Sequence, residues 1–111
     1  MLEPPFLKPL LPPEGSAFYT YILLCADGTF YTGWTTDVGK RLKVHNEGKG
    51  AKYTRCRLPV SLIGFWKFET KSEAMKLEHW IKQLPRTAKQ RFIQDEKIPL
   101  DFLKACRNED L

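Results

Sequence analysis

The sequence contains no apolar run that would cross a membrane. A transmembrane helix needs ~20 consecutive apolar residues, and no segment of the 111-residue chain comes near that length. Five of the eight prolines fall within residues 1–17, where they prevent the apolar helix that a signal peptide needs. We therefore expect a cytoplasmic protein without a membrane partner, and we interpret residues 1–17 as an extended proline-rich arm.

Cysteine is also scarce. The three cysteines, Cys25, Cys56 and Cys106, lie far apart and form no Cys-x-x-Cys pair or Cys/His cluster. This pattern argues against a disulfide framework and against a zinc site, so we expect reduced thiols. A hydrophobic content of 42% and a charged content of 28% are typical of a folded domain and argue against disorder.

Acidic residues are nearly absent from two stretches. Residues 40–57 contain seven Lys or Arg and one acid, and residues 82–91 add four Lys or Arg and no acid. Residues 95–111, in contrast, read as an acidic tail, so the basic character of the chain belongs to a domain at residues 18–94. Such segregation favours a groove that follows a phosphate backbone. The residues we expect to bind nucleic acid are Lys40, Lys49, Lys52, Tyr53, Arg55, Lys82, Arg86 and Lys89.

Two strands, at residues 18–25 and 29–34, flank the turn Ala26-Asp27-Gly28. A two-residue loop would point Tyr21 and Tyr31 to opposite faces of the hairpin, because side chains alternate along a strand. A three-residue loop, with its glycine in the left-handed conformation, would place both phenols on one face. If the two tyrosines work together, the turn is of the second kind.

A helix is expected from the N-cap residue Asp37 to about Asn46. It places Arg41 and His45 one turn apart. Each has an ordinary alternative, since a helix arginine is usually solvated and a single histidine usually lies at the surface.

The second half of the sequence predicts one more strand and two more helices. Residues 59–67 read as a buried strand, and Thr70 with Glu73 forms a capping box. A last helix is expected from Pro85 to about Gln94. The loop GKGAKYTR, before the strand, is basic and offers a tyrosine for stacking on a base. The helix that follows the capping box has an apolar stripe of Ala74, Leu77, Ile81 and Leu84.

Glu78 borders this apolar stripe and needs a partner for its charge. A metal ion is one partner. A salt bridge to Lys82, four residues further along, is the other, and from the residues alone it is the more common arrangement.

Together these segments resemble the GIY-YIG nuclease superfamily, in particular its small bacterial members related to the nuclease module of the excision-repair protein UvrC. The half-motifs are Thr20-Tyr21-Ile22 and Tyr31-Thr32-Gly33. They are followed by Thr35 to His45, by NEGKGAKYTR, and by Ser72 to Lys82. The order and spacing of all the pieces are more specific than any one of them. The resemblance implies an α+β fold with a three-stranded antiparallel sheet flanked by three helices.

The resemblance also implies metal-dependent hydrolysis of DNA phosphodiester bonds. Glu78 would be the single protein ligand of Mg²⁺ or Mn²⁺, with no small-molecule cofactor. Tyr21 would be the general base or would position the attacking water. Tyr31 and His45 would hold water and phosphate, and Arg41 would stabilise charge on the phosphate. The expected substrate is single-stranded or irregular DNA cut with little sequence specificity, with RNA left open.

The sequence departs from this family at Trp34, where relatives carry a lysine three residues after the second motif's tyrosine. A free phenol has a pKa of ~10 and needs a proton acceptor to act as a base. Without that lysine, the acceptor we favour is His45. The alternative functions are a non-catalytic nucleic-acid-binding module with the same fold and a basic domain with no nucleic-acid partner.

Overall fold

The computed structural model describes residues 9–95 of the chain. Three antiparallel strands form one sheet in the order β2-β1-β3, so β2 and β3 are its edges. The strands are β1 (Phe18–Leu24), β2 (Phe30–Thr35) and β3 (Ser61–Phe68). The helices are α1 (Val38–Asn46), α2 (Lys52–Arg55), α3 (Lys71–Lys82) and α4 (Arg86–Asp95). The predicted α+β architecture is confirmed.

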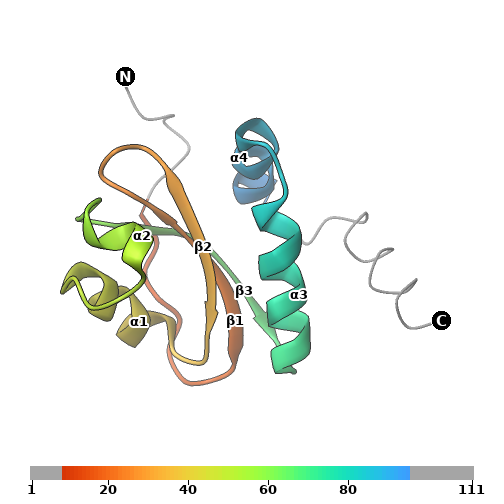
Figure 1. Ribbon diagram of the computed structural model, residues 1–111. Coiled ribbons are helices and arrows are strands. Elements are labelled where there is room, and N and C mark those ends of the chain that lie inside the picture. The colour runs from red at the N-terminus through yellow and green to blue at the C-terminus, as the bar shows by residue number, and fades with distance from the viewer. Residues whose placement is uncertain (1–8, 96–111) are drawn as a thin grey trace.

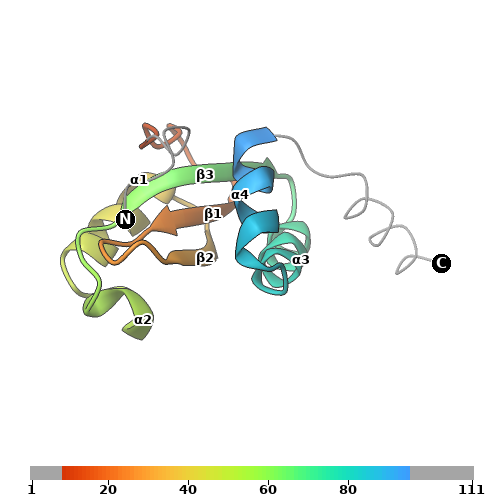
Figure 2. The same cartoon turned by 90° about the horizontal axis from the view of Figure 1, so that it is seen from above.

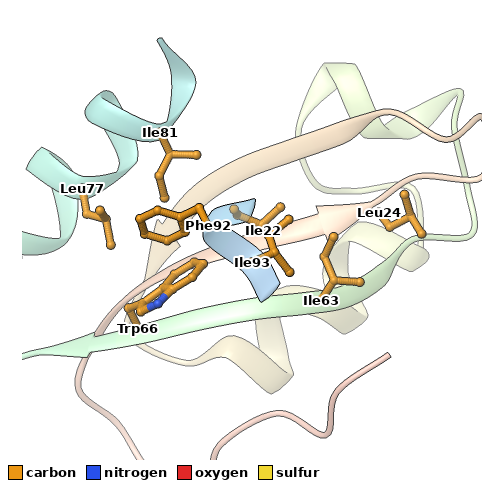
Figure 3. Packing of buried hydrophobic residues seen from close by; sticks show 8 residues of the cluster. All are labelled: Ile22, Leu24, Ile63, Trp66, Leu77, Ile81, Phe92 and Ile93. Carbon is orange, nitrogen blue, oxygen red and sulfur yellow. The ribbon is translucent and has the colours of Figure 1, made fainter. Parts of the chain in front are cut away.

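The helices lie on both sides of the sheet, with α1 and α2 on one side and α3 and α4 on the other (Figures 1 and 2). Alternate residues of β1 serve the two sides. Ile22 and Leu24 pack against α3 and α4, where Leu77 and Phe92 complete a buried core (Figure 3). On the opposite face, a second buried cluster joins the strand residues to α1; its members are Tyr19, Tyr21, Leu23, Cys25, Val38, Val60 and Leu62. Burying both faces fixes the register, because a shift by one residue would exchange them.

The hairpin has the three-residue loop. The Cys25 amide donates to the Thr29 carbonyl at 2.8 Å, and the Gly28 amide donates to the Cys25 carbonyl at 2.9 Å. Gly28 has φ +85°, the left-handed conformation that glycine adopts at little cost. Tyr21 therefore pairs with Gly33, and Tyr31 pairs with Leu23. The two phenols share one face of the sheet, as the three-residue loop predicts.

The helix starts agree with the predicted caps. The Asp37 carboxylate accepts from the Lys40 amide at 3.0 Å at the start of α1. The Thr70 hydroxyl accepts from the Glu73 amide at 3.2 Å at the start of α3. These bonds satisfy amide donors that have no partner inside the helix.

Two elements differ from the prediction by more than one residue. The basic segment that we predicted as a loop contains the single-turn helix α2, which begins after Ala51; the Thr54 amide donates to the Ala51 carbonyl at 3.1 Å. The strand predicted from residue 59 begins at Ser61. Both backbone groups of Val60 are bonded to the Asn46 side chain, at 2.8 and 3.0 Å, so they are not free to extend the sheet.

The described part of the N-terminal arm lies against the domain. The Leu10 amide donates to the Leu62 carbonyl of the edge strand β3 at 2.8 Å. Residues 1–8 and 96–111, which include most of the predicted acidic tail, are outside the described residues. Between residues 9 and 95, no helix has the length and apolar character needed to cross a membrane.

One buried hydrogen bond sets the position of α3 on the sheet. The Thr20 hydroxyl donates to the Ala74 carbonyl at 2.7 Å, and both residues are fully buried. Glu78 follows Ala74 by one helical turn. The first half-motif therefore also positions the helix that carries the proposed metal ligand.

Gly28→Ala should lower the free energy of unfolding by about 1–2 kcal/mol, because a Cβ disfavours the left-handed conformation. Gly28→Asn is the matched control and should cost less, because asparagine tolerates that conformation. Urea unfolding of the three proteins measures the difference. Equal stability of the alanine variant and the parent protein would contradict this account of the turn.

Candidate active site

Two phenols and an imidazole form an aromatic cluster on the α1 side of the sheet, in which Tyr21 and His45 are buried and Tyr31 is half-buried. The Tyr21 and Tyr31 rings lie 6.4 Å apart between centroids. His45 approaches from the last turn of α1, with its ring 5.2 Å from Tyr31 and 6.0 Å from Tyr21. His45 has no exposed surface, so it is not an ordinary surface histidine.

A chain of hydrogen bonds runs through His45. Its Nε2 lies 3.0 Å from the Tyr21 hydroxyl, and its Nδ1 lies 2.9 Å from the Thr54 hydroxyl. The Thr54 hydroxyl also donates to the Ala51 carbonyl at 3.0 Å. A hydroxyl has only one proton to donate, so the Thr54 oxygen accepts a hydrogen bond from the Nδ1–H group of His45. Nε2 of His45 therefore carries no proton, and the Tyr21 hydroxyl donates a hydrogen bond to it.

Burial keeps both members of the Tyr21–His45 pair neutral. It lowers the pKa of His45 to about 4, and the positive charge of Arg41 adds to this effect. Burial raises the pKa of Tyr21 to about 12, although a hydrogen bond from Arg41 opposes it. At neutral pH the proton therefore stays on the Tyr21 phenol, and the unprotonated Nε2 of His45 accepts its hydrogen bond.

Arg41 and Glu78 act on both phenols. Burial raises the pKa of Tyr31; Arg41 lowers that pKa, and the negative charge of Glu78 raises it. The same two charges act on Tyr21 in the same directions. The structure thus places the two phenols, the guanidinium and the imidazole together, and the charge of the Glu78 carboxylate acts on both phenols. Glu78 comes from α3, on the other side of the sheet, and α3 contacts the edge strand β2.

The Glu78 side chain is suited to a hard divalent ion. Its carboxylate forms the alternative salt bridge to Lys82, but the separation is 3.6 Å and the lysine side chain is 51% exposed. Such an i,i+4 pair contributes only ~0.3–0.5 kcal/mol, so a divalent ion would readily replace it. Within residues 9–95 no group of three or more His, Cys, Asp or Glu side chains is placed to hold a metal. One carboxylate, with water and substrate phosphate as further ligands, is a donor set typical of Mg²⁺.

Comparison with known proteins identifies the family of this chain. Residues 17–91 match the sequence profile of the GIY-YIG catalytic domain. The chain belongs to the GIY-YIG family. Membership implies a nuclease fold, a nucleic-acid substrate and the divalent metal that GIY-YIG nucleases typically use.

Small proteins of this family are similar along most of their length. The UPF0213 protein RBAM_000440 of Bacillus velezensis is 52% identical over 84 residues, which are 76% of this chain and 85% of that protein. The UPF0213 protein SAG0778 of Streptococcus agalactiae serotype V is 56% identical over 79 residues, 71% of this chain and 90% of that one. A solution NMR structure of the UPF0213 protein BH0048 from Bacillus halodurans is 46% identical, covers 78% of this chain and 92% of its own, and has a TM-score of 0.49.

Two glycines permit the close contacts of this GIY-YIG site. A Cβ at Gly33, the glycine of the second half-motif, would lie 2.6 Å from the Tyr21 hydroxyl. A Cβ at Gly50 would collide with the His45 ring at Nδ1. Both positions therefore need glycine so that the phenol and the imidazole meet.

Sequence reasoning missed the roles of Thr54 and Gly50. A usable signal was present, because a catalytic histidine needs a partner on its second ring nitrogen. Thr54 is the one residue of the segment KYTR that is buried. Its hydroxyl was overlooked because the segment was interpreted as a loop.

The predicted nucleic-acid-binding residues divide into two groups. Tyr53, Lys82 and Lys89 line one pocket beside Tyr31, and the Arg86 guanidinium lies 4.6 Å from the Phe30 ring in its wall. The other four are exposed on α1, on α2 and on the loop between them: Lys40, Lys49, Lys52 and Arg55.

Thr54→Val should leave the Nδ1–H group of His45 without a partner. An unsatisfied buried donor costs about 1–3 kcal/mol of stability, and part of the proton population should move to Nε2. Thr54→Ser keeps the hydroxyl and is the matched control. Imidazole ¹⁵N NMR distinguishes the tautomers, and a proton on Nε2 in the parent protein would contradict the assignment.

Stability should fall as the pH is lowered from ~6.5 to about 4. A histidine in the unfolded chain titrates near ~6.5, whereas the folded pKa of His45 is about 4. Between these values the unfolded chain binds a proton that the folded chain does not, so acid favours unfolding. The loss is on the order of 3 kcal/mol. Urea unfolding across this range should show a shallower pH dependence for His45→Gln, and an identical slope in both proteins would refute the shift.

Proposed function

We propose that this GIY-YIG protein is a metal-dependent endonuclease that hydrolyses DNA phosphodiester bonds. The observation that carries the proposal is the hydrogen-bond chain from Tyr21 through His45 to Thr54, because it presents a neutral proton acceptor to the phenol. A binding module has no need for such a chain. It also gains nothing from Glu78, because a carboxylate repels phosphate unless a cation intervenes.

The protonation states support a proton relay from Tyr21 to His45 and argue against a Tyr21 that is ionised before the substrate binds. The pKa of Tyr21, about 12, lies far above that of His45, about 4, so the phenol does not ionise at rest. In the proposed step the water oxygen bonds to phosphorus as the bond from phosphorus to the leaving oxygen breaks. The leaving oxygen takes the electron pair of that bond, departs as an alkoxide and takes a proton from solvent. The water proton passes to the Tyr21 oxygen while the phenolic proton passes to His45 Nε2. Tyr21 stays neutral throughout, and His45 ends as the imidazolium.

Substrate binding should make His45 a stronger base. The positive charge of Arg41 is one of the causes that lower its pKa. A phosphate paired with the Arg41 guanidinium supplies a compensating negative charge, which raises the pKa of the imidazole. His45 therefore gains basicity when a scissile phosphate is in place.

The remaining groups act on the phosphate. Arg41 offers a planar fork of N–H donors that suits two phosphate oxygens and stabilises the charge that develops there. Tyr31 stands beside Tyr21 and His45, where it holds water or phosphate. Glu78 would hold Mg²⁺ or Mn²⁺, which supplies electrostatic stabilisation of the phosphoryl oxygens.

We expect little sequence specificity and a preference for single-stranded or irregular DNA. We assign the catalytic domain to residues 18–94. Specific DNA interfaces bury roughly 1,000–2,500 Å² of protein surface, a large share of the 7289 Å² that this protein exposes.

The test is incubation of the purified protein with labelled single-stranded and duplex DNA in the presence of Mg²⁺, Mn²⁺ or EDTA. Tyr21→Phe should slow cleavage roughly 10²- to 10⁴-fold, the usual contribution of a positioned acid–base group. Glu78→Gln should abolish the stimulation by metal. The matched controls Tyr19→Phe and Glu69→Gln make the same chemical changes outside the aromatic cluster of Tyr21, Tyr31 and His45. They should leave the rate unchanged.

Two outcomes would overturn the proposal. A protein that shifts DNA in a gel but cuts it with neither metal is a nucleic-acid-binding module. Cleavage that survives Glu78→Gln undiminished excludes Glu78 as the metal ligand.

A further inference from the structure

A pocket of about 220 Å³ lies at the outer edge of β2 beside the proposed catalytic cluster. Its lining comes from β2, α2, α3 and α4: Phe30, Tyr31, Thr32, Tyr53, Lys82 and Lys89. Because β2 is an edge strand, the pocket reaches the two faces of the sheet, with α2 on one side and α3 and α4 on the other (Figures 1 and 2). The volume is below the roughly 300–1,000 Å³ of pockets for drug-sized ligands, so it suits a single flat ring system.

The aromatic wall of this pocket is held in place before any ligand arrives. The Tyr53 ring stacks on Tyr31, with 6.2 Å between centroids and 27° between planes. Arg57 lies 4.0 Å from the Tyr53 ring centre and donates to the Tyr53 carbonyl at 2.7 Å. It is also ion-paired with Asp27 of the hairpin turn at 2.9 Å. A wall fixed in this way loses little conformational entropy when a planar group stacks on it.

The charges of the pocket suit an anionic ligand with a flat ring. Two lysines contribute to its lining and no acid does. Lys82 is ion-paired with Glu78 at 3.6 Å, and Tyr31 belongs to both the pocket and the aromatic cluster. A group in the pocket is therefore adjacent to the place where the scissile phosphate would bind.

We infer that this pocket receives one unpaired nucleobase next to the scissile phosphate, with Lys82 and Lys89 on the flanking phosphates. The inference rests on the proposed nuclease function and adds a base subsite to it. A base within a duplex is stacked and paired, so it enters a pocket only after it leaves the helix. Base–aromatic stacking favours any base, which gives a preference for single strands without a sequence preference.

The first test uses the intact protein and a single-stranded oligonucleotide with one abasic nucleotide at its centre. Products are mapped at single-nucleotide resolution beside those of the unmodified strand. Cleavage should fall roughly tenfold or more at the one bond whose neighbouring base is missing, while the other bonds report the basal rate. Tyr53→Ala should remove this local dip, and the matched variant Tyr53→Phe should retain it.

Uniform cleavage across the abasic site would overturn the base subsite and leave the nuclease function standing. Absence of cleavage on every substrate would refute the nuclease function instead.

A second readout needs no cleavage. A strand carrying 2-aminopurine should lose fluorescence on binding in EDTA, because the base stacks on an aromatic ring, and Tyr53→Ala should reduce that loss. Equal quenching by both proteins would refute the subsite whether or not the protein cuts DNA.

Discussion

The buried hydrogen bond between Tyr21 and His45 is the interaction on which the rest of the site depends. It requires that the first strand point a phenol to the α1 side, and that α1 end with an imidazole at the same depth. Thr54 fixes the tautomer from the far side of the ring. The backbone at Gly33 lies close to the Tyr21 side chain, and the backbone at Gly50 lies close to the His45 ring. A methyl group at either position would displace that ring. The glycine of the second half-motif is thus a steric requirement for the position of the Tyr21 hydroxyl.

The position of the site at a sheet edge explains how so small a domain assembles it. The phenols and the imidazole belong to one side of the sheet, whereas Glu78 belongs to a helix on the other. At the outer edge of β2, residues from the two sides line one pocket. Within the described residues, β2 pairs with β1 on one side and with no strand on the other. The bond from Thr20 to Ala74 keeps α3 at the height that this pocket requires.

The features predicted from the sequence depend on residues that are close together along the chain. The Asp-Gly turn located the hairpin, and capping residues located α1 and α3. The parity of the strands tied a shared face of the two tyrosines to a three-residue loop, but the loop length itself came from the structure. The partner of His45 was not predicted, because Thr54 reaches it through a single-turn helix that has no periodic signal. The pocket proposed to receive a base was not predicted either, because its walls come from segments about 60 residues apart along the chain. Tyr53 was predicted to stack on a base, but the contact between the Arg57 guanidinium and the Tyr53 ring is seen only in the folded structure.

A double-mutant cycle on DNA cleavage tests the central claim most directly. The rates of the parent protein, Tyr21→Phe, His45→Gln and the double variant are measured under one metal concentration. Two residues that pass one proton act as a unit, so the double variant should cleave no more slowly than the worse single variant. A double variant slower by the product of the two single effects would show that Tyr21 and His45 work independently, and would contradict the relay.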